Sequence, residues 1–226
     1  MSSLDLYSKI EPLIGFYDAY ENLYDIYLKE LVFLDKKSLL DVGCGNGKFL
    51  QRLSSFDAKG IDISQSMVDV CLAKGLDVEC KRVEDVDEKF EVVTAIADVL
   101  NYLDEVELES FLSGVESVLE SGGYFLCDVN TLFGFSEVAD GTMVNSEFED
   151  KFLAVEAFFD GECLETEFNY FEKTGECYKK DSWQIKQFYH DIEMIKSLTS
   201  LKLVKVVDIN LFSEDDADKV LLVFKH

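Results

Sequence analysis

The chain has 226 residues, and 21 Lys and Arg face 46 Asp and Glu, so its formal net charge is −25. A field of this sign repels nucleic-acid backbones and anionic membrane surfaces, so we expect neither as a partner. It favours neutral or cationic small molecules, although the same charge also serves solubility alone. The length allows one α/β domain with a substantial core, or that core and a small subdomain.

The cysteines indicate the compartment. None of the six stands in a Cys-x-x-Cys pair and there are only two histidines, so we expect no metal site. Several lie in apolar strand patterns, where a free thiol behaves as a small hydrophobe. No apolar run is long enough to span a bilayer, and residues 1–5 do not resemble a signal peptide. We therefore expect a cytoplasmic protein with reduced thiols.

Helical spacing fills residues 1–35, which Pro12 and Gly15 divide into two pieces. Strands are then expected at 38–42, 59–63, 76–80, 91–96 and 124–129, alternating with helices that start near Asn46, after Ser64 and at Asp104. This alternation predicts a doubly wound, mostly parallel sheet, in which ligands bind at the carboxyl ends of the strands.

The pattern changes after Asn130. Period-two stretches between 147 and 189, with turn signals at Asp160-Gly161 and at 173–175, predict a three-stranded antiparallel insertion. A helix at 191–201 and strands at 203–209 and 220–224 would complete the sheet, with the last strand antiparallel. The expected fold is a Rossmann-like seven-stranded sheet in 36–133 and 190–226, with an insertion in 134–189.

The stretch from Leu39 to Gly47 is typical of a strand that ends in a glycine turn. Its spacing is Gly-x-Gly-x-Gly, which differs from the dinucleotide pattern Gly-x-Gly-x-x-Gly. Asp41 before the turn disfavours a pyrophosphate but suits the sulfonium and ammonium groups of S-adenosylmethionine. Asp62, at the end of the second strand, could accept hydrogen bonds from two ribose hydroxyls.

These residues resemble a known family. Asp41-Val42-Gly43-Cys44-Gly45-Asn46-Gly47 looks like motif I of the class I S-adenosylmethionine-dependent methyltransferases, and Asp62 matches their ribose-binding acid. The resemblance covers about residues 39–130, through 90–94, 97–102 and 120–126. The remainder resembles the small-molecule branch of the family, including sugar amine N-methyltransferases, in layout only.

The resemblance implies S-adenosylmethionine as cofactor and a set of residues that contact it. These residues are Asp41, Gly43, Cys44, Gly45, Asp62, Ile63, Met67, Glu84, Asp85, Ala97 and Asp98. Either Glu84 or Asp85 would meet the adenine amino group, and both stay open. The helical segment 1–35 would close over the cofactor as a lid, with Tyr7 and Tyr17 as candidate contacts.

Methyl transfer needs alignment more than a catalytic triad, and no triad is evident. His190, Tyr189 and Asn101 are the candidate catalytic residues, and Trp183, Asn130 and Tyr102 are further acceptor-site candidates. For His190 a position at a helix start facing water is the simpler expectation. Core packing is an equal alternative for the aromatic residues.

An insertion after the fifth strand must project over the carboxyl edge or beside it, so we expect it to cap the acceptor. Alternatively it could pair two copies of the chain, through exposed Phe158, Phe159, Phe168 and Phe171.

Three functions remain open. The first is methyl transfer to N or O of a small molecule. The second is S-adenosylmethionine binding without catalysis. The third, an NAD-dependent oxidoreductase, is disfavoured by the glycine spacing, by Asp41 and by the lack of a Tyr-Lys or His-Asp set.

Overall fold

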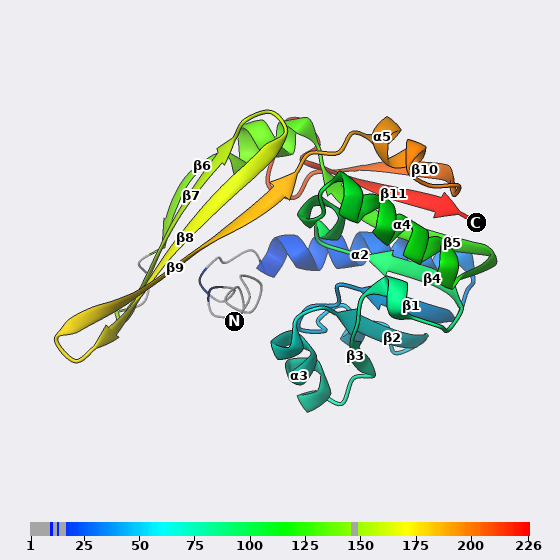
Figure 1. Cartoon of the computed structure of the whole chain (residues 1–226), viewed down its shortest axis with the longest axis horizontal. Coiled ribbons are helices and arrows are strands. Elements are labelled where there is room, and N and C mark those ends of the chain that lie inside the picture. Colours follow the sequence, from blue (N-terminus) through cyan, green and yellow to red (C-terminus); the bar gives the residue numbers. More distant parts are fainter. Residues whose placement is uncertain (1–9, 11–12, 14–16, 146–148) are drawn as a thin grey trace.

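The structure is a computed structural model that describes residues 10, 13, 17–145 and 149–226 (Figure 1). It consists of an α/β core and a separate, extended antiparallel sheet. The core contains α2 (Tyr17–Leu34), β1 (Ser38–Val42), β2 (Asp57–Asp62), α3 (Gln65–Ala73), β3 (Val78–Cys80), β4 (Phe90–Ala95), α4 (Glu105–Val118), β5 (Leu119–Asn130), α5 (Ile192–Ser197), β10 (Lys202–Ile209) and β11 (Lys219–Lys225). Short helical turns are η1 (Leu50–Arg52), η2 (Val83–Asp85), η3 (Val99–Tyr102) and η4 (Gly134–Ala139).

The core sheet has seven strands in the order β10-β11-β5-β4-β1-β2-β3. Strands β1 to β5 pair in parallel, and β11 pairs antiparallel with both β5 and β10. The expected Rossmann-like sheet with an antiparallel last strand is therefore confirmed. Its parallel strands all end at one edge, here called the carboxyl edge.

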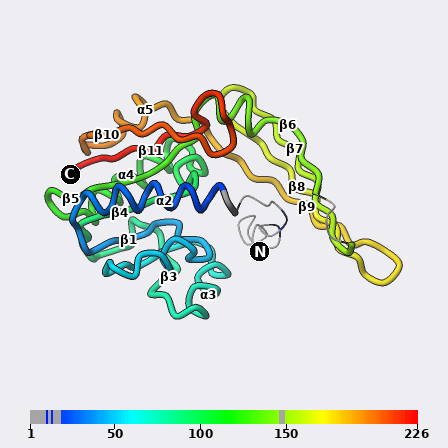
Figure 2. Tube along the Cα trace, turned by 180° about the vertical axis from the view of Figure 1, so that it is seen from behind, coloured from blue at the N-terminus to red at the C-terminus, as the bar shows by residue number. Residues whose placement is uncertain are grey.

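Alternate side chains of each strand enter one of two cores, because successive residues point to opposite faces of a sheet. Leu39 and Val92 pack with α2 and α3 on one face, whereas Leu40 and Val93 pack with α4 on the other. Figure 2 shows α2 lying along its face of the sheet. The sheet is thus buried on both sides, which explains the continuous apolar run of β4.

Helix α4 begins where its sequence predicts. The Asp104 side chain accepts a hydrogen bond from the Glu107 amide (2.9 Å), and Glu107 accepts one from the Asp104 amide (3.3 Å). This reciprocal pair is a capping box, which satisfies two backbone donors at the helix start.

The second sheet, here called the arm, extends away from the core (Figures 1 and 2). It has four antiparallel strands, β6 (Gly141–Asn145), β7 (Lys151–Phe159), β8 (Cys163–Thr174) and β9 (Cys177–Phe188), rather than the expected three. Both predicted hairpin turns are present. The alternating residues of β8 are buried on one face of the arm, its inner face: Leu164, Thr166, Phe168 and Tyr170.

The prediction of a helix after Gly47 is wrong. Only nine residues, 48–56, connect the glycine turn to β2, and they form the single turn η1. A helix of nine residues rises about 14 Å, which is shorter than the roughly 20 Å of a six-residue strand it must run back along. Similarly, the helix expected at 191–201 is reduced to the six residues of α5.

Among the described residues, no helix is both long and apolar enough to cross a bilayer. The predicted break at Pro12 and Gly15 lies outside the described residues.

Candidate functional site

The glycine turn after β1 adopts a backbone that favours glycine at three places. Gly43, Gly45 and Gly47 have φ values of +70°, +52° and +76°, in the left-handed region. A Cβ on Gly43 would lie 2.7 Å from Val99 Cγ2, and one on Gly47 would lie 2.4 Å from Leu76 Cδ1. A Cβ on Gly45 would meet no described atom within 4 Å. Gly43 and Gly47 therefore pack against the protein, whereas Gly45 borders open space that a ligand could fill.

Asp62 closes this turn from the neighbouring strand. Its Oδ2 accepts a hydrogen bond from the Gly45 amide (2.9 Å), and its Oδ1 accepts one from the Ser64 amide (2.8 Å). The Ile61 carbonyl accepts from the amides of Gly43 and Cys44, so three hydrogen bonds connect the end of β2 to the glycine turn. The carboxylate is thereby fixed beside the open space at Gly45.

Asp41 lies deeper, with only 2 % of its surface exposed. Its Oδ1 accepts a hydrogen bond from the Thr94 hydroxyl (2.8 Å). Burial raises the pKa of Asp41 to about 7, the Thr94 hydrogen bond opposes the rise, and the charge of Asp62 adds to it. A cation bound nearby would favour the ionised form.

Ile63 and Met67 follow Asp62 and differ in exposure. Ile63 is 59 % exposed, and Met67 is buried in α3, which starts at the N-cap Ser64 as predicted. An exposed apolar side chain next to the Asp62 carboxylate is suitable for covering a flat aromatic ring.

Glu84 and Asp85 lie in η2, and the structure separates them. Glu84 accepts a hydrogen bond from Ser110 of α4 (3.1 Å) and lines a groove of about 580 Å³ along that helix. The Asp85 side chain is exposed. Contact of either one with an adenine stays a prediction.

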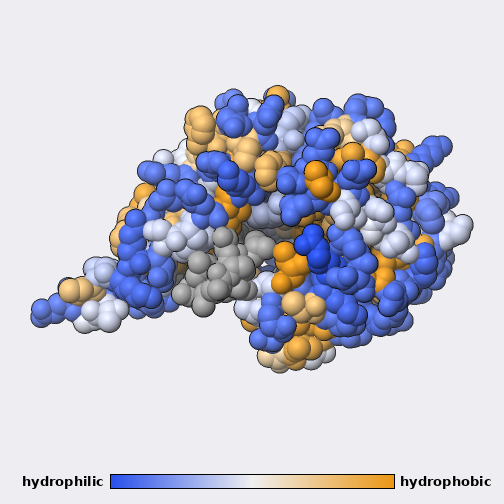
Figure 3. All heavy atoms as spheres, in the orientation of Figure 1, coloured by the Kyte–Doolittle hydropathy of each residue, from blue (hydrophilic) through white to orange (hydrophobic). Residues whose placement is uncertain are grey.

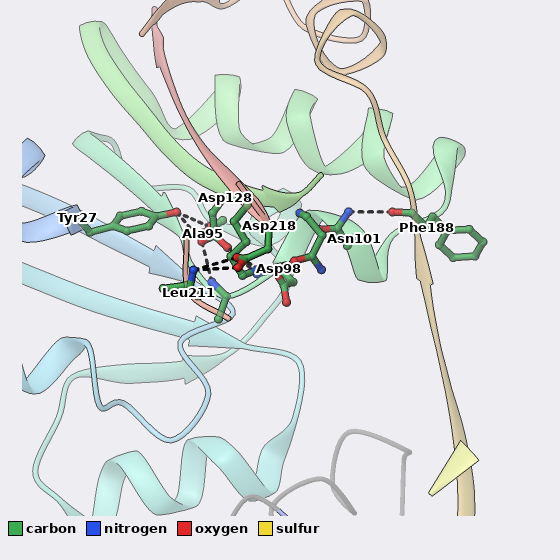
Figure 4. Close-up of polar contacts among 11 residues, drawn as sticks. Tyr27, Ala95, Asp98, Asn101, Asp128, Phe188, Leu211 and Asp218 are labelled. Carbon is green, nitrogen blue, oxygen red and sulfur yellow. Dashed lines mark hydrogen bonds and ion pairs between the residues drawn. The ribbon is translucent and has the colours of Figure 1, made fainter. Parts of the chain in front are cut away.

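Ala97 and Asp98 form an unusual turn after β4. Both have positive φ, +64° and +67°, although neither is glycine. Asp128, buried in β5, accepts hydrogen bonds from the Ala97 amide (2.9 Å) and the Asp98 amide (3.2 Å), and Tyr27 of α2 donates a third (2.8 Å). Figure 4 shows Tyr27, Asp128 and Asp98 converging at this point. Burial raises the pKa of Asp128 to about 6, and the hydrogen bonds from Tyr27 and Ala97 oppose that rise.

Asn101 joins the core to the arm. Its side chain is buried, its Nδ2 donates to the Phe188 carbonyl (2.8 Å) and its Oδ1 accepts from the Asn130 amide (3.0 Å) (Figure 4). Both polar atoms are thus used in positioning β9 and the end of β5. A catalytic role for Asn101 stays a prediction that would have to work through these neighbours.

His190 is 3 % exposed, so the expectation that it faces water is wrong. Its Nε2 lies 2.9 Å from the Leu103 carbonyl, and no described residue contacts Nδ1 through a hydrogen bond. Burial lowers the pKa of His190, and the Leu103 carbonyl opposes this. With Nε2–H donating to that carbonyl, the neutral ring keeps a free lone pair on Nδ1.

The aromatic candidates divide between two sites. Trp183 stacks on Phe168 (centroids 5.5 Å apart, 11° between planes) in the cluster that also contains Tyr102, Ile10 and Leu13. Its indole nitrogen is buried without a partner in the described part of the chain. Tyr189 instead meets Phe135 edge-on at 6.2 Å. Tyr7 and the side chain of Tyr17 lie outside the described residues.

Sequence reasoning missed Tyr27, Asp128 and Lys219. The signal available was a charge inside an apolar strand, since Asp128 interrupts β5 and Lys219 opens β11. The Lys219 ammonium contacts Asn130 Oδ1 (2.8 Å), Asp128 Oδ2 (3.3 Å) and the Asp98 carboxylate.

Comparison with known proteins bears on this arrangement. Residues 39–123 match the family model described as a methyltransferase domain. A putative methyltransferase of Geobacillus sp. (strain WCH70) is 29 % identical over 148 residues, and the match spans 59 % of each of the two chains. Residues 39–123 therefore match a methyltransferase domain, and the rest of the chain lies outside that match.

Solved structures agree with this family at the level of the fold. An S-adenosylmethionine-dependent methyltransferase from Clostridium acetobutylicum ATCC 824 superposes with a TM-score of 0.81 at 22 % identity, covering 97 % of each chain. An amino pentose methyltransferase from Micromonospora echinaspora, solved with S-adenosylmethionine bound, gives 0.72 at 17 % identity over 97 % of this chain and 96 % of that one. The family resemblance read from residues 39–130 is confirmed.

The residues at the carboxyl edge fit the cofactor of this family. The space at Gly45 leaves room for it, and the fixed carboxylate of Asp62 suits paired hydroxyl groups. The open space at Gly45 and the hydrogen-bond acceptors of Asp62 thus fit S-adenosylmethionine, the cofactor predicted from the resemblance.

Proposed function

We propose that the protein transfers the methyl group of S-adenosylmethionine to the nitrogen or oxygen of a small molecule. The observation that carries this proposal is the open space at Gly45, bordered by the Asp62 carboxylate at the carboxyl edge. The family and the fold support it, and the amino pentose methyltransferase among the structural neighbours favours an amine acceptor.

The chain's own residues would bind and orient the cofactor. Asp62 would accept from the ribose hydroxyls, Ile63 would cover the adenine, and the backbone of the glycine turn would line the methionine end. Asp41 would supply negative charge near the cationic groups, because a bound cation favours its ionised form, and Asp98, which is paired with Lys219, would lie beside them. When bound, the cofactor supplies a methyl group on a positively charged sulfur that leaves readily. The protein's task is then alignment and exclusion of water.

The arm would cap the acceptor from the other side. Its inner face offers the stacked pair Phe168 and Trp183, and Tyr102 of η3 packs against the same cluster. Aromatic faces attract a cationic amine. His190, whose Nδ1 keeps a free lone pair, would receive the proton that an amine or hydroxyl releases.

An acceptor screen tests the proposal. Libraries of primary amines, secondary amines and hydroxyl compounds are incubated with enzyme and S-adenosylmethionine, and S-adenosylhomocysteine release is measured. We expect turnover with at least one amine class. Binding of the cofactor with no turnover across all classes would support the alternative, a cofactor-binding protein without catalysis.

Two substitutions in strand β9, one of them a matched control, test whether the arm caps the acceptor. Trp183→Phe and Tyr178→Phe both alter aromatic residues of β9, but Trp183 is buried on the inner face and Tyr178 is exposed near the tip of the arm. We expect only the first to lower turnover, with the affinity for S-adenosylmethionine unchanged in both. Equal turnover in the two variants would remove the inner face from the acceptor site.

Two further proposals concern the cellular location and the oligomeric state of the protein. We propose a cytoplasmic location, because all six cysteines are free thiols. As the alternative use of the arm we propose a homodimer through its outer face, where Phe158 is 67 % exposed. Phe168, expected at such an interface, is buried on the inner face instead.

A further inference from the structure

Lys219 is a buried cation in the middle of the site. Only 2 % of its surface is exposed, and its ammonium contacts Asn130 Oδ1 at 2.8 Å, Asp128 Oδ2 at 3.3 Å and the Asp98 carboxylate. Lysine is rarely buried to this extent unless it is paired. Three acceptors match the three N–H donors of an ammonium group, so this lysine is fully paired.

The turn that Lys219 contacts is held in an unfavourable conformation. Ala97 and Asp98 both adopt the left-handed region, and such backbone persists only where the surroundings enforce it. Asp128 enforces it by accepting both amides, and these hydrogen bonds are stronger when its carboxylate is ionised. The Lys219 ammonium stands between the carboxylates of Asp98 and Asp128, which would otherwise repel each other.

This turn also forms a wall of the cofactor site. Val99, the next residue, has its Cγ2 2.7 Å from where a Cβ of Gly43 would stand, so the turn and the glycine turn are in direct contact. Lys219 also contacts the side chain of Asn130. The backbone amide of Asn130 in turn donates a hydrogen bond to the side chain of Asn101. Lys219 therefore connects the cofactor side of the carboxyl edge to the acceptor side.

We propose that Lys219 is a positioning residue, which holds the Ala97–Asp98 turn against the glycine turn so that S-adenosylmethionine meets a preformed site. The proposal rests on the cofactor site proposed above. It predicts that removal of the ammonium weakens binding of S-adenosylmethionine and of S-adenosylhomocysteine to a similar degree, because both ligands would contact the same Ala97–Asp98 turn. A lysine that acted only through its charge would give a different result: its removal would favour the cationic cofactor over the neutral product.

The test compares Lys219→Met, Lys219→Arg and Lys225→Met with the wild type. Lys225 lies on the same strand and is exposed, so its substitution controls for loss of a β11 lysine. Binding of both ligands is measured by calorimetry on protein that retains a cooperative unfolding transition. We expect Lys219→Met to weaken both at least tenfold, Lys219→Arg to recover most of the affinity, and Lys225→Met to match the wild type. Hydrogen exchange at the amides of Ala97 and Asp98 should accelerate at least tenfold in Lys219→Met alone.

The outcomes separate the two proposals. If the wild type does not bind S-adenosylmethionine, the proposed function fails. If the wild type binds and Lys219→Met binds equally well, or gains preference for S-adenosylmethionine over S-adenosylhomocysteine, only the positioning role is overturned. Should Lys219→Met not fold, Lys219→Gln replaces it, since its amide can still donate to Asn130, and the same loss of both affinities is required.

Discussion

At the residue scale, Asp62 has the most exactly defined geometry among the predicted ligands. Its two oxygens accept from the amides of Gly45 and Ser64, and a carboxylate oxygen can accept more than one hydrogen bond. We expect Asp62→Ala to raise the Kd for S-adenosylmethionine about 10- to 150-fold, since lost hydrogen bonds to a charged group cost roughly 1.5–3 kcal/mol. Asp57→Ala, at the exposed start of the same strand, is the control. Wild-type affinity in folded Asp62→Ala would remove Asp62 from the site.

Asp41 makes stability depend on pH. Its pKa is raised by burial from 3.8 to about 7, so the folded protein holds a proton that the unfolded chain releases. The contribution of Asp41 to stability is therefore complete below about pH 4 and is lost as the pH rises through 7. We expect the free energy of unfolding of the wild type, minus that of Asp41→Asn, to fall by at most about 4 kcal/mol over this range.

Urea titrations of both proteins without cofactor measure this difference at each pH. Asn can still accept the Thr94 hydrogen bond, so the variant removes the charge and keeps the contact. A difference that is independent of pH, or that rises with pH, would contradict the buried carboxylate.

Local sequence predicts some of these residues and not others. The glycine turn and Asp62 are recognisable because a few adjacent residues determine a strand end and a turn. Lys219 and Asp128 are 91 residues apart in the chain and meet only through the register of β11 on β5. The burial of His190 is not predictable for the same reason, because its hydrogen-bond partner Leu103 is 87 residues away in the chain.

At the element scale, two glycines of the same turn are predicted to have different roles. Gly47 packs against the protein, whereas Gly45 borders the space proposed for the ligand. Gly45 and Gly75 both have left-handed backbone, and a Cβ on either meets no described atom within 4 Å. We expect Gly45→Ala and Gly75→Ala to cost a similar 1–2 kcal/mol of stability, about the left-handed penalty of a side chain, while only Gly45→Ala loses cofactor affinity. Thermal unfolding and calorimetric titration of the two variants check this, and equal affinity would show that the ligand does not approach Gly45.

Gly47→Ala provides the contrast within the same turn. Its Cβ would lie 2.4 Å from Leu76 Cδ1 and 2.8 Å from Cys71 Sγ, so packing between the turn and α3 must shift. We expect a lower unfolding temperature than for Gly45→Ala. An unfolding temperature equal to that of Gly45→Ala would contradict the close packing at Gly47.

Most strands were predictable to within two residues, because alternation and apolar runs are local properties. The helix after Gly47 was not, since its failure follows from the distance that nine residues must cover between β1 and β2. The fourth strand of the arm, β6, was also missed. It is short, and its pairing with β7 is what defines it.

At the scale of the whole molecule, the arm has two faces with different predicted uses. The inner face carries the aromatic cluster, whereas Phe158 on the outer face lies beside the Glu165–Lys186 ion pair. On the side of the molecule seen in Figure 3, hydrophilic residues predominate and hydrophobic ones form separate patches.

We expect a homodimer through the outer face to dissociate in Phe158→Asp, with cofactor affinity unchanged, as sedimentation velocity and calorimetry would show. A wild type that sediments as a monomer would contradict that pairing.

The central claim is that the carboxyl edge of this sheet binds S-adenosylmethionine. The most direct measurement is a calorimetric titration of the wild-type chain with S-adenosylmethionine, S-adenosylhomocysteine and NAD, repeated with Gly45→Ala. We predict one site for the first two ligands, no heat with NAD, and loss of the site in the variant. Binding of NAD without S-adenosylmethionine, or S-adenosylmethionine binding that persists unchanged in Gly45→Ala, would contradict the account.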